Sequence, residues 1–153
     1  MIIMNKEMLL RLIQSQHLIP KLRSKLEERD LRKTAYQFDG NQMCMIRRIS
    51  RSEGMTQIEL SNEVLIPAPT VMRKLNRLIE AGVIERRDDS TDYRKNRLYL
   101  TEAGREVAQM VNELNVRHTE LLFDGFTEEE RDQYADFLER IRQNGQKALK
   151  ENR

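Results

Sequence analysis

The sequence predicts a mainly α-helical protein with a small β-wing of two or three strands. Of its 153 residues only six are Gly and three are Pro, which favours helices over a fold of strands and turns. Apolar residues recur at helical spacing along most of the chain, and the strand-like stretches lie between residues 83 and 100. The length suits a single domain, and a hydrophobic content of 39% is enough to build a core.

Composition excludes several classes of protein. A single cysteine, Cys44, excludes a disulfide framework within the chain and a zinc site built on cysteines. The two histidines, His17 and His118, lie far apart in the chain and form no H-E-x-x-H pair. No apolar run approaches the ~18 residues of a membrane span, and the first residues do not form a secretory signal. We therefore expect a cytoplasmic protein without a membrane partner.

The first helical region covers residues 5–35, where leucines and isoleucines recur at roughly helical spacing. Pro20 interrupts this pattern, since it lacks the N–H that a helix interior needs. Either one helix kinks there, or a second helix starts with Pro20 in its first turn. We expect two segments.

Two capping boxes mark the starts of two short helices in the middle of the chain. Asp39 with Gln42 forms the first box, and the helix that it opens ends before Gly54. Thr56 with Glu59 forms the second box.

A basic helix is predicted over residues 68–81. Pro69 suits its first turn, and Gly82 ends it in the left-handed conformation. Its inward stripe comprises Val71, Leu75, Leu78 and Gly82. Its opposite face carries Thr70, Arg73, Lys74 and Arg77.

Two short strands, residues 83–87 and 97–100, follow the basic helix and are joined by a polar loop. Thr101 caps the next helix, which Gly125 breaks, and Thr127 caps a final helix. Three glutamates in the first turn of that last helix stabilise it, because their negative charges lie at the positive end of the helix dipole. Its apolar stripe comprises Tyr134, Phe137, Leu138, Ile141 and Ala148.

A helix, a tight turn, a basic helix and a hairpin with a basic tip stand in the order of a winged helix-turn-helix. The major groove of DNA, about 12 Å wide, admits a helix whose outer face carries hydrogen-bond donors. Arg73 can form two hydrogen bonds to guanine. Base edges or thymine methyl groups can be contacted by Ala68, Pro69 and Thr70, and phosphates by Lys74 and Arg77. Arg94 at the hairpin tip suits the adjacent minor groove.

Positive charge is concentrated in this part of the chain. Residues 70–97 hold eight basic and five acidic side chains, a balance of +3, whereas residues 124–153 hold six and eight, a balance of −2. A local excess of this kind is what contact with a polyanion needs.

Residues 56–104 resemble the MarR family of bacterial transcription regulators. Thr56-Gln57-x-Glu59-Leu60 is similar to the opening of the family's third helix. Thr70-Val71-x-Arg73-x-x-x-Arg77-Leu78-x-x-x-Gly82-Val83-Ile84-x-Arg86 is similar to its recognition helix and first wing strand. The strongest resemblance is the wing signature, Asp92-Tyr93-Arg94-x-x-x-Leu98-x-Leu100-Thr101-x-x-Gly104.

The resemblance implies one domain over residues 1–153, with dimerisation helices in 1–36 and 102–153. Residues 37–101 would form the winged helix-turn-helix, with the helix-turn-helix motif at about 56–82 and the wing at about 83–101. It also implies a homodimer on a pseudo-palindromic operator in a bacterial or archaeal cell, acting as a ligand-responsive repressor. The expected effector is a small aromatic acid, with no cofactor and no metal.

The DNA-binding residues that these arguments predict are Thr56, Gln57, Ala68, Pro69, Thr70, Arg73, Lys74, Arg77, Asp92, Arg94 and Lys95. In wings of this family the aspartate braces the arginine, so Asp92 would orient Arg94. Two departures concern the turn. Leu65 stands where the family often has Gly, and since a left-handed Leu65 costs roughly 1 kcal/mol, we expect a slightly different turn. Pro67 stands at the N-cap of the recognition helix and has no side chain that can cap it.

Other interpretations remain open. The basic helix and wing would also serve a helical protein-interaction module that binds a protein rather than DNA. We interpret Cys44 as a packing residue rather than a redox sensor. We interpret the methionines as core filling rather than as a metal site. The chain carries no P-loop, no G-x-G-x-x-G and no G-x-S-x-G motif, so we expect no enzyme.

Overall fold

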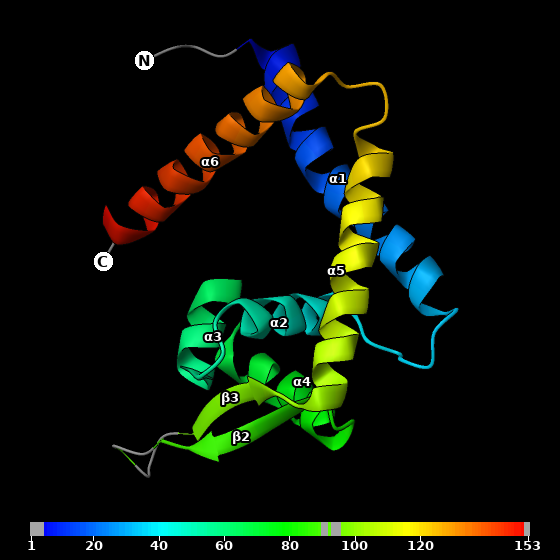
Figure 1. Ribbon diagram of the computed structural model, residues 1–153. Helices are drawn as coiled ribbons and strands as arrows, with labels where there is room; N and C mark the ends of the chain where they lie inside the picture. Colours follow the sequence, from blue (N-terminus) through cyan, green and yellow to red (C-terminus); the bar gives the residue numbers. More distant parts are fainter. Residues whose placement is uncertain (1–4, 90–91, 93–95, 152–153) are drawn as a thin grey trace. The chain divides into compact units, whose positions relative to one another are not determined.

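The computed structural model describes residues 5–89, 92 and 96–151, and these residues form six helices and a three-stranded sheet. The elements are α1 Lys6–Leu31, α2 Gly40–Arg51, β1 Met55–Thr56, α3 Gln57–Val64, α4 Ala68–Glu80, β2 Ile84–Asp88, β3 Asn96–Leu100, α5 Glu102–Leu122 and α6 Glu128–Glu151 (Figure 1). The chain divides into two compact units, Met1–His118 and Thr119–Arg153. The mainly helical fold class is confirmed.

Helix α1 is continuous, so the prediction of two segments was wrong. Pro20 lies inside it, and Asn5 caps its start by accepting a hydrogen bond from the Glu7 N–H at 3.0 Å. Proline removes one intrahelical hydrogen bond, whereas the remaining turns of the 26-residue helix keep theirs. Only the C-terminal end of α1 is buried, at Glu27, Asp30 and Leu31.

Both capping boxes are confirmed. The Gln42 N–H donates to Asp39 Oδ1 at 3.0 Å, and Gln42 Oε1 accepts from the Asp39 N–H at 3.1 Å. At the start of α3 the Glu59 N–H donates to Thr56 Oγ1 at 3.2 Å, and Glu59 Oε2 accepts from the Thr56 N–H at 2.7 Å. These local bonds start α2 and α3 sharply.

The turn between α3 and α4 passes through Leu65 in the left-handed conformation, with φ 53° and ψ 36°. The expectation that the turn avoids this conformation was therefore wrong. Ser61 Oγ donates to the Ile66 carbonyl at 2.7 Å and helps to hold the turn. Leu65 is 77% exposed, so its side chain adds no packing that would offset the backbone cost.

Helix α4 fully buries one narrow face. Val71, Leu75 and Leu78 are fully buried, as predicted. Gly82 is exposed and ends the helix with φ 70°, so it does not belong to the inward stripe. Pro67 makes no side-chain cap, and its carbonyl accepts from the N–H groups of Thr70 at 2.9 Å and Val71 at 3.1 Å.

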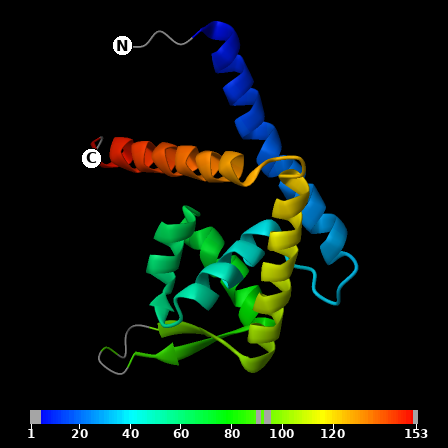
Figure 2. The same cartoon turned by 45° about the horizontal axis from the view of Figure 1, so that its top comes forward.

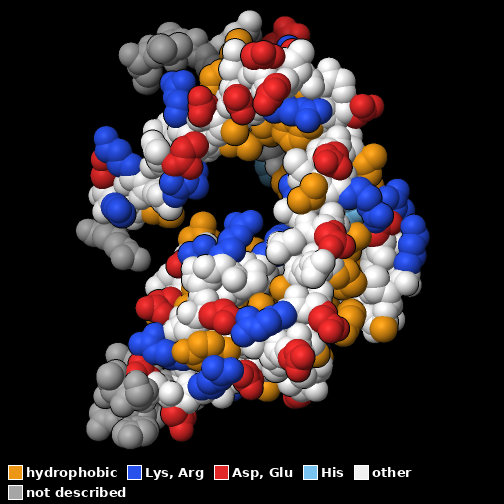
Figure 3. Space-filling model, in the orientation of Figure 1, with side chains coloured by type: hydrophobic (Ala, Val, Ile, Leu, Met, Phe, Trp, Pro, Cys, Tyr) orange, Lys and Arg blue, Asp and Glu red, His pale blue; other side chains and the backbone are white. Residues whose placement is uncertain are grey.

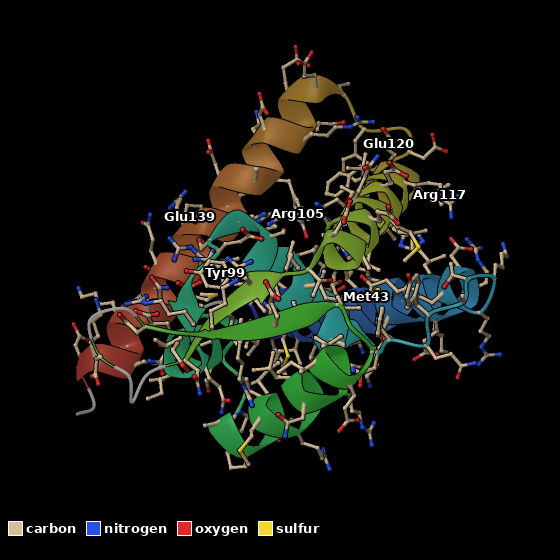
Figure 4. The ribbon with its side chains drawn as sticks, turned by 60° about the horizontal axis from the view of Figure 1, so that its bottom comes forward. Met43, Tyr99, Arg105, Arg117, Glu120 and Glu139 are labelled. Atoms are coloured by element: carbon tan, nitrogen blue, oxygen red, sulfur yellow. The ribbon has the colours of Figure 1, made fainter. Side chains whose placement is uncertain are left out.

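The sheet has the order β1-β3-β2 and is antiparallel throughout. Ile84 pairs with Leu100, and Arg86 pairs with Leu98. Figures 1 and 2 both show α2, α3 and α4 on the same side of the β2–β3 hairpin. The alternation along the strands buries Leu98 and leaves Tyr99, labelled in Figure 4, on the other side, where the Arg87 guanidinium lies 4.3 Å from its ring centre.

The hydrophobic core lies in the first unit and joins the helix-turn-helix to the sheet and to α5. Met43, Met45 and Met55 belong to it, which confirms core filling for these three, whereas Met72 is 49% exposed. Cys44 is a half-buried free thiol.

The second unit contains an aromatic cluster and α6. Phe123 makes edge contacts with Phe126 and Tyr134, with ring centres 5.4 and 5.2 Å apart. Thr127 caps α6, as predicted, by accepting from the Glu130 N–H at 3.2 Å. No residue of α6 from 128 to 151 is buried, and Phe137, Leu138 and Ile141 are about half exposed. The predicted apolar stripe therefore lies on the surface of this unit.

Candidate nucleic-acid interface

The exposed face of α4 is the centre of the candidate site. Arg73 and Arg77 are exposed, as are Ala68 and Pro69 in the first turn, and Thr70 is half-buried. Because the buried face is narrow, the side chains opposite Val71 and Leu75 extend into solvent. The long cationic side chains of Arg73 and Arg77 are thus available to a polyanion.

Lys74 has a different environment from the one that the sequence indicates. Its ammonium group pairs with Asp39 Oδ2, and its side chain is only 15% exposed. Burial opposes the ionisation of Asp39, but the hydrogen bonds from Lys74 and from the Gln42 N–H hold the pKa of Asp39 below its usual value. Lys74 lies three residues after Val71, at the edge of the buried face, and so ties α4 to the N-cap of α2.

Thr56 and Gln57 lie at the start of α3. The Thr56 hydroxyl is occupied within the capping box, where it accepts from the Glu59 N–H and lies 3.0 Å from Glu59 Oε2. Gln57 is half-buried and accepts a hydrogen bond from Arg86 of β2 at 3.3 Å. The same Arg86 nitrogen, Nη2, donates to Asn76 Oδ1 of α4 at 3.0 Å.

Sequence reasoning missed Asn76 and assigned no contact to Arg86. The available signal for Asn76 is its position three residues after Arg73, which places both on one face of a helix. Arg86 lies two residues after the buried Ile84 in β2, so its side chain is on the same face of the strand and points towards the helices. No pattern within the strand predicts which helical residues it meets.

The base of the wing is held by a buried aspartate, which sequence reasoning also missed. Asp89 is 4% exposed, and its Oδ2 accepts from Arg97 Nε at 2.8 Å and Nη2 at 2.7 Å. Arg97 Nη1 also donates to the Gly54 carbonyl at 2.6 Å, so one guanidinium links both wing strands to the loop before β1. Asp92 is half-buried, whereas Arg94 and Lys95 lie outside the described residues.

Charges of both signs cover the lobe that carries this site. Figure 3 shows blue Lys and Arg side chains interspersed with red Asp and Glu side chains on its visible face. Within the described parts of the chain, no group of three or more His, Cys, Asp or Glu side chains is arranged to hold a metal ion. No described helix carries an apolar stretch long enough to cross a bilayer.

Helix α3, the turn at Leu65, helix α4 and the three-stranded sheet together define a winged helix-turn-helix protein. Residues 36–95 match the sequence model of the MarR family. The resemblance to this family that the motifs indicated is confirmed over these residues.

A curated relative and solved structures are also similar to this chain. The chain is 27% identical over 121 residues to the HTH-type transcriptional regulator YybA of Bacillus subtilis, which covers 79% of this chain and 77% of YybA. The crystal structure of MarR is similar with a TM-score of 0.74 and 28% identity, covering 89% of this chain and 98% of that one. Streptococcus pneumoniae FabT, solved in complex with DNA, has a TM-score of 0.78 and 26% identity, covering 90% of this chain and 97% of that one.

Proposed function

We propose that this protein is a transcription regulator that binds double-stranded DNA sequence-specifically as a homodimer. The observation that carries the proposal is the exposed cationic face of α4, on which Arg73 and Arg77 extend from a helix anchored by Val71, Leu75 and Leu78. The similarity to FabT, which was solved in complex with DNA, supports it. In this proposal the protein is a regulator and not an enzyme, and it acts in the cytoplasm.

In the proposed complex, α4 of each protomer enters a major groove. Arg73 forms two hydrogen bonds to guanine O6 and N7, and Arg77 contacts phosphate. Two half-sites about one helical turn apart, roughly 34–36 Å, then require two copies of α4 related by a two-fold axis. In the wing, Arg94, which Asp92 helps to orient, contacts the adjacent minor groove, and Lys95 also contacts the DNA.

Exposed apolar side chains support the homodimer. Leu10, Ile13 and Leu18 of α1 are each at least 43% exposed. On α6, Phe137 and Ile141 are each 54% exposed. Apolar faces of this kind are typical of surfaces that a second chain covers.

The proposed regulator is a repressor that a small aromatic acid releases from DNA. Such an effector acts only if it binds one spacing of the two recognition helices more tightly than the other. Screening small aromatic acids for release of the protein from its selected DNA tests this part of the proposal.

The main test separates base recognition from contact with phosphate. We expect Arg73→Ala to lose discrimination among sequences by about 1–3 kcal/mol, and Arg77→Ala to weaken all sequences alike and to lower the salt slope by about one. Sequences selected from a random duplex pool provide the specific DNA, and Arg32→Ala, which removes an exposed cation at the end of α1, is the control.

The alternative is a module that binds a protein through the wing and basic helix. It requires DNA binding that is absent or independent of salt, because no phosphates would be neutralised. Gel shifts at two salt concentrations distinguish the two functions. If both arginine variants bound specific and random DNA as the wild type does, the assigned contacts would be wrong.

A further inference from the structure

Arg86 of β2 connects the two helices of the helix-turn-helix through a single nitrogen. Its Nη2 atom lies 3.0 Å from Asn76 Oδ1 on α4 and 3.3 Å from Gln57 Oε1 on α3. A guanidinium Nη2 carries two hydrogens, so it can donate one to each amide. Three elements distant in the sequence thus converge on one cation.

The contact with Arg86 determines which way the two amides point. A guanidinium only donates hydrogen bonds and accepts none, so the oxygen of each amide, not its nitrogen, must face Arg86. The NH2 groups of Asn76 and Gln57 are then directed away from the oxygen that Arg86 holds. Asn76 is exposed, so its NH2 group is accessible to a molecule bound at α4.

Asn76 lies on the face of α4 that would meet DNA. It follows Arg73 by three residues, so the two side chains are neighbours on one side of the helix, and both are exposed. Asparagine reads adenine by accepting a hydrogen bond from N6 at Oδ1 while it donates to N7. At Asn76 this oxygen already accepts from a cation, and an adenine amino group would bring a second donor beside that positive charge.

We propose that Arg86 is a specificity-determining positioning residue, which sets Asn76 to donate to base acceptors and to reject adenine. The inference rests on the proposed function, because it needs α4 in the major groove. Guanine, with O6 and N7, and thymine, with O4, present acceptors to the Asn76 NH2 group, whereas adenine places an amino donor beside its N7 acceptor. Arg86 acts through Asn76 and makes no base contact of its own.

The test begins with duplexes selected by the wild-type protein from a random DNA pool. Comparison with Asn76→Ala identifies the base pair that Asn76 reads. Four duplexes that differ only at this base pair, in both half-sites, are then titrated with wild-type protein, Arg86→Met and Arg87→Met. Arg87 is the matched control because it is the next residue of the same strand, has the same charge and lies against Tyr99.

We expect the wild type to prefer guanine or thymine at this position. Arg86→Met frees Asn76 Oδ1, so the affinity for the adenine duplex should rise about tenfold relative to the other three, in the range of one bidentate base contact. Arg87→Met should change the four affinities by a common factor. Thermal unfolding of both variants checks that each is folded.

Three results would overturn the inference. The first is a wild-type preference for adenine at the position that Asn76→Ala relaxes. The second is an equal change of all four affinities in Arg86→Met. The third is a loss of affinity in Asn76→Ala that is the same for every sequence. Enrichment of no sequence at all by the wild type would refute the proposed function itself, and the inference with it. Enrichment followed by an unchanged base preference in Arg86→Met refutes the inference alone.

Discussion

Leu65 is the one described residue other than glycine that has a positive φ. A residue with a β-carbon pays about 1–2 kcal/mol of conformational free energy in the left-handed region. The Leu65 side chain is 77% exposed, so its packing offsets little of this cost. The turn keeps this conformation because Leu60 before it and Val71 after it are both fully buried, which leaves few paths between the two helices. Local strain is here a consequence of packing on either side.

Relief of this strain should stabilise the protein. We expect Leu65→Gly to raise the free energy of unfolding by up to about 1 kcal/mol, after the larger conformational freedom of glycine in the unfolded chain is subtracted. Leu65→Ala keeps a β-carbon and should bring no such gain. Urea unfolding measures both variants, and equal stability of the two would contradict the argument.

Two glycines in helices should respond in opposite ways to substitution by alanine. A β-carbon at Gly104, in the first turn of α5, would lie 2.0 Å from the Val83 carbonyl oxygen. At Gly145 of α6 no described atom beyond its chain neighbours and the adjacent helix backbone lies within 4 Å of the position that a β-carbon would take. We expect Gly104→Ala to destabilise the protein by about 1–3 kcal/mol and Gly145→Ala to stabilise it by roughly 0.5–1 kcal/mol. Melting temperatures that move in the same direction would exclude this explanation.

At the scale of elements, a buried carboxylate joins α1 to α5. Asp30 of α1 has a side chain that is 2% exposed, and its Oδ2 lies 2.9 Å from His118 Nε2 and 2.7 Å from Arg117 Nη2, both of α5. Arg117 is labelled on α5 in Figure 4. Arg29 Nε, at 3.1 Å, and Lys33 Nζ, at 3.2 Å, contact the other carboxylate oxygen. His118 is fully buried and is therefore a structural residue.

This cluster predicts a loss of stability in acid. The hydrogen bonds from Arg29 and His118 hold the pKa of Asp30 far below the usual 3.8, against the effect of burial. A depressed pKa in the folded state contributes stability that is complete above the unfolded value and declines as the pH falls below it. Asp30→Asn should therefore be less stable than the wild type at pH 7, with a difference that shrinks below about pH 4.

Urea unfolding of both proteins between pH 7 and pH 2 measures this difference. Glu139→Gln is the control, because Arg142 lowers the pKa of Glu139 to about 2 while both side chains remain exposed. An exposed pair of this kind contributes little to stability. A difference for Asp30→Asn that stays constant with pH would show that the carboxylate is not the group responsible.

For the whole molecule, the apolar surface of α6 predicts that the protein is a dimer. We expect Phe137→Glu combined with Ile141→Glu to produce monomers, because two charges would have to be buried in the contact. Sedimentation equilibrium measures the association, and the affinity for a two-half-site duplex should fall with it. Gln146→Glu, a charge on the opposite side of α6, should leave the dimer intact. A dimeric double variant would place the contact elsewhere.

Local features of this protein were predictable from the sequence because their causes are local. The capping boxes of Asp39 and Thr56 and the buried stripe of Val71, Leu75 and Leu78 depend on residues within one or two turns of each other. Pro20 and Leu65 were misjudged for one reason. In both cases a local backbone cost was weighed alone, whereas the rest of the helix at Pro20 and the packing beside Leu65 outweigh it.

The sequence by itself determined the order of the elements, the exposed Arg73 and Arg77 of α4 and the resemblance to a family, since each depends on short-range periodicity or on a motif. Only the tertiary structure decided that Lys74 pairs with Asp39, that Asp30 meets His118 and that Arg86 joins Gln57 to Asn76. These partners are 35, 88, 29 and 10 positions apart. A polar side chain at such a distance finds its partner only when packing of the apolar core has brought the two elements together, and no spacing along the chain encodes that meeting.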